Sequence, residues 1–256
     1  MAKRNLRGLR AIVTGASGGI GAALARELVD VGTRVLITAR RADRLRSLTE
    51  ELRGRGGDVE WIAGDLTDPA IRQQLVTTAQ SRWAGLDILI NNAGAGRWGA
   101  FSSGSESQLR DILELDFFAP VELTRLALPL LRESPAGLIV NMGSVLGHRA
   151  VPLKSEYCAA KFALHGWSDA LRAELARDGV DVLLVSPSTT ATEFFDRAGE
   201  TRRPSAMSPA KVAQLTRRAM QAGRHEVILS WGGKLLVWLD RLCPPLMNRF
   251  IARYAK

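Results

Sequence analysis

Cysteine is scarce in this sequence: Cys158 and Cys243 are the only two, and they lie far apart along the chain. Two isolated thiols argue against a disulfide framework and a cysteine-based zinc site, and we expect no metal site. They are typical of a reducing compartment, so we expect a cytoplasmic protein. The basic N-terminal stretch has no apolar segment before the first strand-like run, and we therefore expect no signal peptide.

Long hydrophobic runs are also lacking, since none approaches the ~18 residues of a membrane-spanning helix. The chain has 256 residues, of which 46% are hydrophobic and 24% charged, so it can bury a large core. No internal repeat, low-complexity segment or linker rich in proline and glycine divides it. We therefore predict a single domain over residues 1–256.

The formal net charge of +9 is the clearest compositional bias. Such a charge favours an anionic partner, such as a phosphate, an acyl-carrier protein or a membrane surface, but a solvated arginine-rich surface would give the same number. No basic stripe with interleaved aromatic residues and no DNA-binding motif is present. We therefore expect no nucleic-acid partner.

Short runs rich in Val, Ile and Leu alternate along the chain with longer stretches of helical spacing. Several of the runs show no polar alternation, which is typical of strands buried on both faces. The expected strands are residues 11–14, 34–38, 59–63, 86–90, 137–141, 180–185 and 226–230. The expected helices are residues 20–31, 41–53, 69–83, 106–132, 155–178 and 209–222. This order predicts an α/β fold, a doubly wound parallel sheet of about seven strands with helices on both faces, as in Rossmann folds.

The first expected strand runs into the glycine-rich turn TGASGGIG, which contains Gly15, Gly19 and Gly21 and precedes a helix. Glycines let a ligand approach the backbone, and a helix N-terminus offers N–H groups and the positive end of its dipole. The spacing G-x-x-x-G-x-G differs from the common G-x-G-x-x-G fingerprint. A tight connection would explain glycines alone, but the position between a strand and a helix favours a dinucleotide phosphate site.

The end of the second strand indicates which dinucleotide is bound. Arg40 and Arg41 stand there, and no carboxylate follows until Asp43. An acidic residue at this point suits the ribose hydroxyls of NAD, whereas an arginine suits a 2′-phosphate through paired, charge-assisted hydrogen bonds. The pattern favours NADP(H) over NAD(H), unless both arginines merely open an exposed helix.

Tyr157 and Lys161 lie four residues apart in the segment SEYCAAKFAL, on one face of an expected helix. A free tyrosine titrates near ~10 and is a poor base at neutral pH. A neighbouring ammonium group stabilises the phenolate and so favours proton transfer by the tyrosine. An exposed helix pair is the ordinary alternative, but the presence in the same chain of the glycine turn, NNAG (91–94) and a serine just after an expected strand favours a catalytic pair.

Taken together, TGASGGIG (14–21), NNAG (91–94), Ser144 and YCAAK (157–161) resemble the short-chain dehydrogenase/reductase superfamily, in particular its ketoacyl reductase-like members. The resemblance runs from about Leu9 to about Leu229. It implies an NADP(H)-dependent oxidoreductase that interconverts a carbonyl and a secondary alcohol. It also implies that Tyr157 is the acid/base, that Lys161 lowers its pKa and binds the nicotinamide ribose, and that Ser144 orients the substrate oxygen.

The same resemblance implies a set of residues that contact the cofactor. The acidic turn GDLTD (64–68) would place Asp65 and Leu66 at the adenine, although the turn reads equally well as a helix N-cap made by Thr67 or Asp68. The full expected cofactor set is Gly15, Ser17, Gly19, Ile20, Gly21, Arg40, Asp65, Leu66, Asn92, Ala93, Gly94, Tyr157, Lys161, Pro187 and Thr192.

Two positions depart from the family pattern. Asp116 stands where many members have an asparagine that holds a water in the proton relay to the lysine. We expect the aspartate to hold that water, to offset part of the effect of Lys161 on Tyr157, and to give a pH optimum different from that of Asp116→Asn. In PSTTAT, Ser188 replaces a common glycine, while Thr192 stays in register for the nicotinamide carboxamide.

Two segments point to an apolar substrate. A loop over about 188–208 carries Phe194, Phe195 and Met207 and is expected to cover the substrate. The amphipathic tail over about 231–256 flanks a Pro-Pro pair with five basic residues and one acid. It could close the fold or pack on another subunit, cap the substrate, or touch a membrane surface. His148 either lines the pocket or is structural.

Competing interpretations remain. A non-catalytic nucleotide-binding scaffold or sensor could keep the fold, although the intact serine, tyrosine and lysine argue against it. The resemblance also implies a homodimer or homotetramer formed through helices 106–132 and 155–178. The sequence does not name the substrate or the direction of the reaction.

Overall fold

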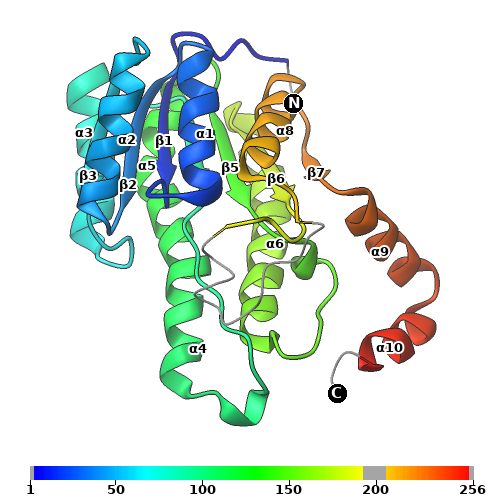
Figure 1. Ribbon diagram of the computed structural model, residues 1–256. Coiled ribbons are helices and arrows are strands. Elements are labelled where there is room, and N and C mark those ends of the chain that lie inside the picture. Colours follow the sequence, from blue (N-terminus) through cyan, green and yellow to red (C-terminus); the bar gives the residue numbers. More distant parts are fainter. Residues whose placement is uncertain (1–2, 193–205, 254–256) are drawn as a thin grey trace.

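Seven parallel strands form the centre of the molecule in a computed structural model, which describes residues 3–192 and 206–253 (Figure 1). Their order in the sheet is β3-β2-β1-β4-β5-β6-β7. The strands are β1 (Arg10–Thr14), β2 (Arg34–Ala39), β3 (Val59–Ala63), β4 (Ile88–Asn91), β5 (Leu138–Met142), β6 (Asp181–Ser186) and β7 (Glu226–Ile228). The order reverses between β1 and β4, and ligands of doubly wound sheets bind at the carboxyl ends of the strands beside such a point.

Helices cover both faces of the sheet. One face packs against α1 (Gly19–Asp30), α2 (Ala42–Gly54) and α8 (Pro209–Gln221). The other face packs against α3 (Pro69–Trp83), α5 (Ala119–Glu133) and the C-terminal end of α6 (Ser155–Leu175). The predicted fold class is therefore confirmed, because every strand pair is parallel and both faces of the sheet are buried.

The helix predicted over 106–132 is confirmed, since residues 106–133 are helical throughout, but it is not a regular α-helix along its whole length. The chain forms α4 (Glu106–Leu113), a wider π-helical turn (Glu114–Phe118) and then α5. A single extra residue in a turn shifts the facing of side chains, and such turns are frequent at functional sites. Here the turn carries the fully buried Asp116.

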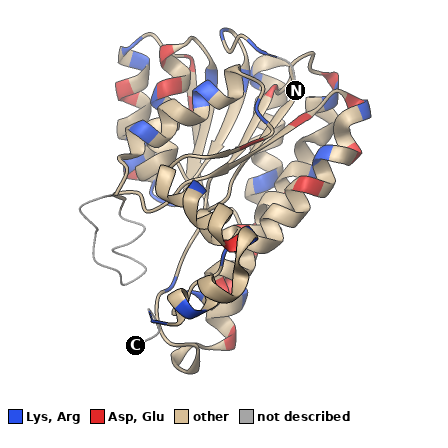
Figure 2. Ribbon diagram, turned by 90° about the vertical axis from the view of Figure 1, so that its right-hand side faces the viewer, with Lys and Arg blue, Asp and Glu red and all other residues tan. Residues whose placement is uncertain are grey.

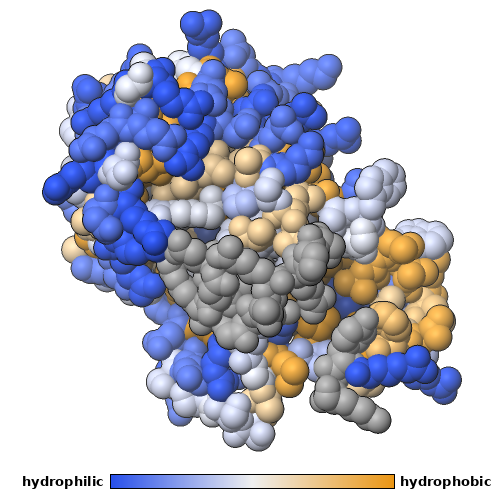
Figure 3. Space-filling view, in the orientation of Figure 1, coloured by the Kyte–Doolittle hydropathy of each residue, from blue (hydrophilic) through white to orange (hydrophobic). Residues whose placement is uncertain are grey.

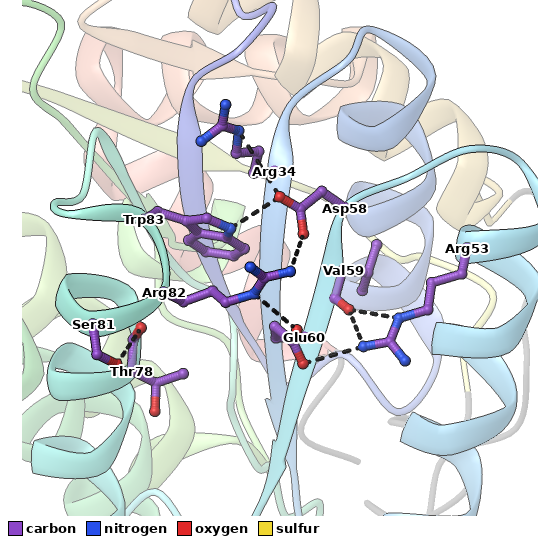
Figure 4. Close-up of polar contacts among 9 residues, drawn as sticks. All are labelled: Arg34, Arg53, Asp58, Val59, Glu60, Thr78, Ser81, Arg82 and Trp83. Carbon is purple, nitrogen blue, oxygen red and sulfur yellow. Dashed lines mark hydrogen bonds and ion pairs between the residues drawn. The ribbon is translucent and has the colours of Figure 1, made fainter.

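The edge strand β3 is covered by an ion-pair network (Figure 4). Asp58 accepts a hydrogen bond from the indole of Trp83 at 3.0 Å, and Glu60 pairs with both Arg53 and Arg82 at 3.1 Å. The Arg53 guanidinium also donates to the open backbone carbonyl of Val59 at 2.7 Å. Charged side chains and a covered carbonyl protect an edge strand from pairing with another chain.

Charge of either sign is dispersed over the body of the protein. In the view of Figure 2, basic residues are interspersed with acidic residues over the helices that surround the sheet. Many of these charges are paired, as in Arg26 with Glu51, Arg132 with Asp178, and Arg217 with Glu27. The Lys and Arg residues that give the net charge of +9 therefore do not form a single basic stripe over that face.

The tail forms two helices, α9 (Trp231–Leu242) and α10 (Pro244–Ala252), which extend from β7 along the side of the molecule (Figure 1). The two prolines form the first turn of α10, where a missing N–H is tolerated. Within the described part of the chain, no helix has the length and apolar character needed to cross a membrane.

Candidate active site

A cleft of about 1330 Å³ opens at the carboxyl ends of the strands. It is bounded by the glycine turn, the segments after β4 and β5, the start of α6 and parts of α9 and α10. Most of the predicted site residues line it, namely Gly15, Ser17, Gly19, Ile20, Arg40, Asp65, Leu66, Asn92, Ala93, Gly94, Ser144, Tyr157, Lys161, Pro187 and Thr192. Gly21 and Asp116 lie behind the lining.

The glycine turn is packed too closely to accept side chains at two of its positions. Gly15 has a φ of +70°, and a Cβ built on it would lie 2.8 Å from the Cα of Ala93. A Cβ on Gly21 would lie 2.6 Å from Nδ2 of Asn92 and still closer to the carbonyl oxygen of Gly15. That amide donates to the carbonyl of Thr14 at 2.8 Å, so the turn and the NNAG segment brace each other.

The turn also offers what a phosphate needs. No side chain caps the N-terminus of α1 at Gly18, so the positive end of the helix dipole faces the cleft. Glycines on both sides of this point leave room for a ligand against the backbone. The residues present therefore fit the pyrophosphate of a dinucleotide.

Gly21→Ala is expected to destabilise the protein by about 1–3 kcal/mol, because the new methyl group meets backbone that cannot move without opening the turn. Thermal or urea unfolding measures the change. Gly166→Ala, on α6 with open space around it, is the matched control and should be neutral or stabilising by about 0.5–1 kcal/mol. Equal stability of the Gly21→Ala variant and the native protein would contradict this packing argument.

Two arginines lie at the end of β2, and they face different surroundings. The side chain of Arg40 is 66% exposed and lies 3.9 Å from Asp65. The guanidinium of Arg41 donates to the carbonyl and the hydroxyl of Ser17, at 3.0 and 3.1 Å, and so reaches the glycine turn. A Cβ on Gly18 would also lie 3.8 Å from the guanidinium of Arg44. Arg41 and Arg44 were absent from the predicted site, although their position just after the second strand was the available signal.

The acidic turn after β3 both lines the cleft and caps a helix, so the structure agrees with both interpretations of this segment. Asp65 and Leu66 line the cleft, while Asp68 caps α3 by accepting from the N–H of Ala70 at 2.8 Å. The backbone N–H of Thr67 hydrogen-bonds the Asp65 carboxylate and holds its pKa below the ordinary value. Asp65 is therefore ready to accept a further hydrogen bond at neutral pH.

Tyr157 and Lys161 lie in the first turns of α6, where both are buried and both line the cleft. Ser144, just after β5, hydrogen-bonds the Tyr157 hydroxyl, and the ring of Trp98 packs edge-on against Tyr157 at 5.4 Å. Burial raises the pKa of Tyr157, Lys161 opposes this rise, and Asp116 adds to it. Lys161 therefore offsets part of the rise, while burial keeps the pKa of Tyr157 above its ordinary value.

Asp116 pairs directly with Lys161, which sequence reasoning did not foresee. Its carboxylate lies 3.0 Å from the Lys161 ammonium, and its other oxygen accepts from the N–H of Ala95 at 2.6 Å. The ammonium also donates to the carbonyl of Met142 at 3.2 Å. Burial raises the pKa of Asp116, against the opposing effect of Lys161. Burial would lower the pKa of Lys161, but Asp116 and Tyr157 together raise it, so the ammonium stays charged.

A second buried group, His165, supports the turn that carries Ser144. Its ring fills the space beside Gly143 and Gly147, where an added Cβ would lie 2.5 Å from Nε2. Burial, and next the neighbouring His148, lower the pKa of His165 to about 3, so the ring is neutral. His148 itself contacts Ser186 at 3.0 Å and does not line the cleft. Of its two interpretations, the structural one therefore holds, and His165 had no sequence signal.

The segment after β6 reaches the glycine turn. The methyl group of Thr192 would lie 3.1 Å from a Cβ on Gly19. Met207 pairs through its backbone with Thr189 and Ala191, and its side chain packs on the hydrophobic core instead of covering the cleft. Phe194 and Phe195 lie outside the described residues.

The far end of the cleft is apolar and owes much to the tail. Leu236 of α9 and Phe250 and Ile251 of α10 line the cleft, as do Trp98 and Leu115. None of these residues was predicted individually, because their approach to the cleft depends on how the tail folds back. Their apolar character suits a hydrophobic substrate.

The fold and the cleft are those of an NAD(P)-dependent oxidoreductase, with a glycine-rich turn and a tyrosine, lysine and serine at one sheet edge. The sequence model of the short chain dehydrogenase family matches residues 10–203, and the chain belongs to this family.

Individual relatives agree with this membership. The ketoacyl reductase HetN of Nostoc sp. is 31% identical over 95% of this chain and 88% of its own length. A short-chain dehydrogenase from Streptomyces avermitilis superposes with a TM-score of 0.82 at 31% identity, covering 97% of this chain and 98% of that one. A short-chain dehydrogenase/reductase from Burkholderia phymatum, in complex with NAD, has a TM-score of 0.87 at 22% identity, covering 95% and 96%. The last likeness concerns the fold alone.

Proposed function

We propose that the protein is an NADP(H)-dependent enzyme that interconverts a carbonyl and a secondary alcohol on an apolar substrate. The observation that carries this proposal is the convergence of Ser144, Tyr157 and Lys161 on one cleft, next to the glycine turn. Their positions allow proton transfer at the point where a nicotinamide would meet a substrate.

When bound, the cofactor supplies the hydride that the carbonyl carbon accepts, or takes it back in oxidation. Tyr157 donates its proton to the carbonyl oxygen, so that hydride and proton together yield the alcohol. Ser144 donates a hydrogen bond to the same oxygen and orients it. Lys161 stays charged beside the tyrosine and stabilises the phenolate that proton donation leaves behind.

Asp116 acts on this proton transfer through its charge, which opposes the effect of Lys161 on the pKa of Tyr157. Because its carboxylate raises the pKa of Tyr157, Asp116→Asn is expected to lower that pKa. Reduction needs the protonated tyrosine, so its rate should start to fall at a lower pH in the variant. Oxidation needs the phenolate, so its rate should rise at a lower pH. Profiles of kcat/KM against pH, recorded for reduction and for oxidation, measure both shifts. Identical profiles for the native protein and the Asp116→Asn variant, or a shift to higher pH in the variant, would contradict this role.

The arginines after β2 support the preference for NADP(H). Arg41 lies against the glycine turn, where a 2′-phosphate on the adenine ribose would accept its charge-assisted hydrogen bonds. A bond of this kind contributes about 1.5–3 kcal/mol, or roughly 10–150-fold. Arg41→Ala should therefore lower kcat/KM for NADPH by about that factor and change the value for NADH little.

Arg40→Ala is the matched comparison, because Arg40 is the more exposed member of the pair. We expect it to have the smaller effect on NADPH. Equal losses with NADPH and NADH in the Arg41→Ala variant would show that Arg41 does not recognise the phosphate. A larger loss of kcat/KM for NADPH with Arg40→Ala than with Arg41→Ala would show that Arg40, as first predicted, binds the 2′-phosphate.

The substrate class is proposed from the cleft and from kinship. The apolar end of the cleft suits a long-chain, steroid-like or ketoacyl substrate, and a relative of this chain is named a ketoacyl reductase. The decisive experiment measures NADPH oxidation with a panel of such carbonyls. Saturable turnover supports the enzyme, whereas tight NADPH binding without turnover of any member would favour the alternative of a nucleotide-binding scaffold or sensor.

We also propose that the enzyme works in the cytoplasm as a homodimer or homotetramer through α4–α5 and α6. Phe118 in the π-helical turn and Phe162 on α6 are 48% and 44% exposed, and large aromatic residues are enriched in subunit interfaces. Analytical ultracentrifugation gives the assembly directly.

A further inference from the structure

The C-terminal arm, which we define as α9 and α10, has a continuous apolar outer face. Trp231, Leu235, Trp238 and Leu242 follow one another at spacings of four, three and four residues along α9, and they are 86%, 55%, 59% and 63% exposed. Such spacing puts all four on one side of a helix. Leu246 of α10, 65% exposed, adds to the set. In Figure 3 hydrophobic residues gather over this part of the surface, whereas the opposite end is hydrophilic.

The exposure of this face is not a consequence of a loose tail. Val237, Met247 and Ile251 point to the other side of the arm, and each is only 7% exposed. Gly233 lies so close to the body that a Cβ on it would be 2.7 Å from the side chain of Val145. The arm therefore has one face packed on the protein and one apolar face turned to solvent.

The charges of the arm match an anionic surface. Its exposed charged residues are all basic, namely Lys234, Arg241, Arg249 and Arg253 just beyond α10. Asp240, the one acid of this segment, is partly buried and pairs with Arg149 of the body at 2.8 Å. Helices with Trp and Leu on one face and with basic residues on their polar side bind the interface of anionic membranes.

We propose that the C-terminal arm docks on the surface of an anionic lipid bilayer, with its apolar face in the boundary between headgroups and acyl chains. Helices of 12 and 9 residues are far shorter than the ~20 residues of a spanning helix, so the arm would lie in the plane of the membrane. The basic residues at its flanks reach the anionic headgroups. The +9 net charge of the chain attracts the protein to the same surface.

The arm joins this face to the candidate active site. Leu236 and Ile251 line the cleft, and Phe250 lines it while remaining 47% exposed. Docking would therefore bring the cleft beside the bilayer. This step rests on the proposed function: the substrate would be a bilayer-dissolved carbonyl or alcohol that enters the cleft past the arm without crossing water.

Flotation with extruded vesicles tests the docking itself. The full-length protein is mixed with vesicles of phosphatidylcholine alone or with a third of anionic phosphatidylglycerol. We expect binding to the anionic vesicles that weakens as salt is raised. The paired substitution Trp231→Ser with Trp238→Ser should lower the partition coefficient by about tenfold or more. Phe101→Ser, at a residue 78% exposed on the body, is the matched control and should bind as the native protein does.

Absence of native binding to anionic vesicles, or equal binding by the double tryptophan variant, would overturn the proposal. So would an assembly that the tryptophan substitutions dissociate in analytical ultracentrifugation, because a second copy would then cover this face. Reduction of a water-soluble ketone without vesicles is measured in parallel. The tryptophan variant should keep the activity that the native protein shows on this ketone. If the native protein turns over neither this ketone nor any carbonyl of the panel, the proposed function is refuted while the docking result stays intact.

Discussion

Replacing Tyr157 by phenylalanine is expected to lower kcat for carbonyl reduction by about 10²–10⁴-fold, the range that a positioned acid/base contributes. The variant keeps the aromatic ring, which packs edge-on against Trp98, and removes only the hydroxyl that contacts Ser144. NADPH affinity should change much less than kcat, because the glycine turn and Lys161 are untouched. Steady-state turnover and quenching of tryptophan fluorescence by NADPH measure the two quantities separately.

Cys158→Ala provides the matched control for this experiment. Cys158 is the neighbour of Tyr157 on α6, is 2% exposed, and does not line the cleft. The Cys158→Ala variant should keep near-native turnover even if the substitution weakens the packing of the helix. If Tyr157→Phe instead turns over carbonyls as fast as the native protein, then another group supplies the proton and the proposed mechanism is wrong.

Replacing Lys161 by methionine is expected to destabilise the fold by about 3–5 kcal/mol, because it leaves the Asp116 carboxylate buried without its partner. The methionine fills the space of the lysine stem, so the loss is electrostatic and not a cavity. Burial then raises the pKa of Asp116 without the opposing effect of Lys161. A raised pKa makes the folded state bind more protons than the unfolded state, so the variant should gain stability as pH falls. Urea unfolding over a pH series measures both effects.

A double-mutant cycle isolates the pair. Adding Asp116→Asn to Lys161→Met removes the unpaired charge while keeping an oxygen for the N–H of Ala95, so most of the lost stability should return. Lys211→Met, on the exposed surface of α8, is the control and should stay within about 0.5 kcal/mol of the native protein. Additive effects of the two substitutions at Asp116 and Lys161 would mean that the ion pair does not form in solution.

Patterns that are local in the chain allowed correct predictions of the fold. Buried parallel strands carry short apolar runs, as AIV in β1 and LIV in β5, because helices cover both faces of the sheet. The helix that follows β1 begins within the glycine turn, at Gly19, and Tyr157 and Lys161 share a helix face through their spacing of four residues. Each of these features depends on neighbours within one or two turns.

The prediction was poorer where packing between distant segments decides the outcome. The position of Arg41 just after the second strand did not show that its side chain, and not that of Arg40, reaches Ser17. The π-helical turn within 106–132 does not have a local signal that separates it from a regular α-helix. Neither does the return of Phe250 to the cleft. Each of these contacts joins elements that are far apart in the chain or that could turn in more than one direction.

The sequence alone determined the class of fold, through the alternation of apolar runs and helical spacing. It also predicted the glycine turn as a phosphate site from its place between a strand and a helix, and its resemblance to a known family predicted the serine, tyrosine and lysine. Only the tertiary structure decided that Asp116 pairs directly with Lys161 and that α9 and α10 wall the cleft while exposing an apolar face. The physical reason is that a buried charge finds its partner, and an amphipathic helix its packed side, through the relative placement of whole elements. That placement depends on sheet order and core packing, which no short stretch of residues contains.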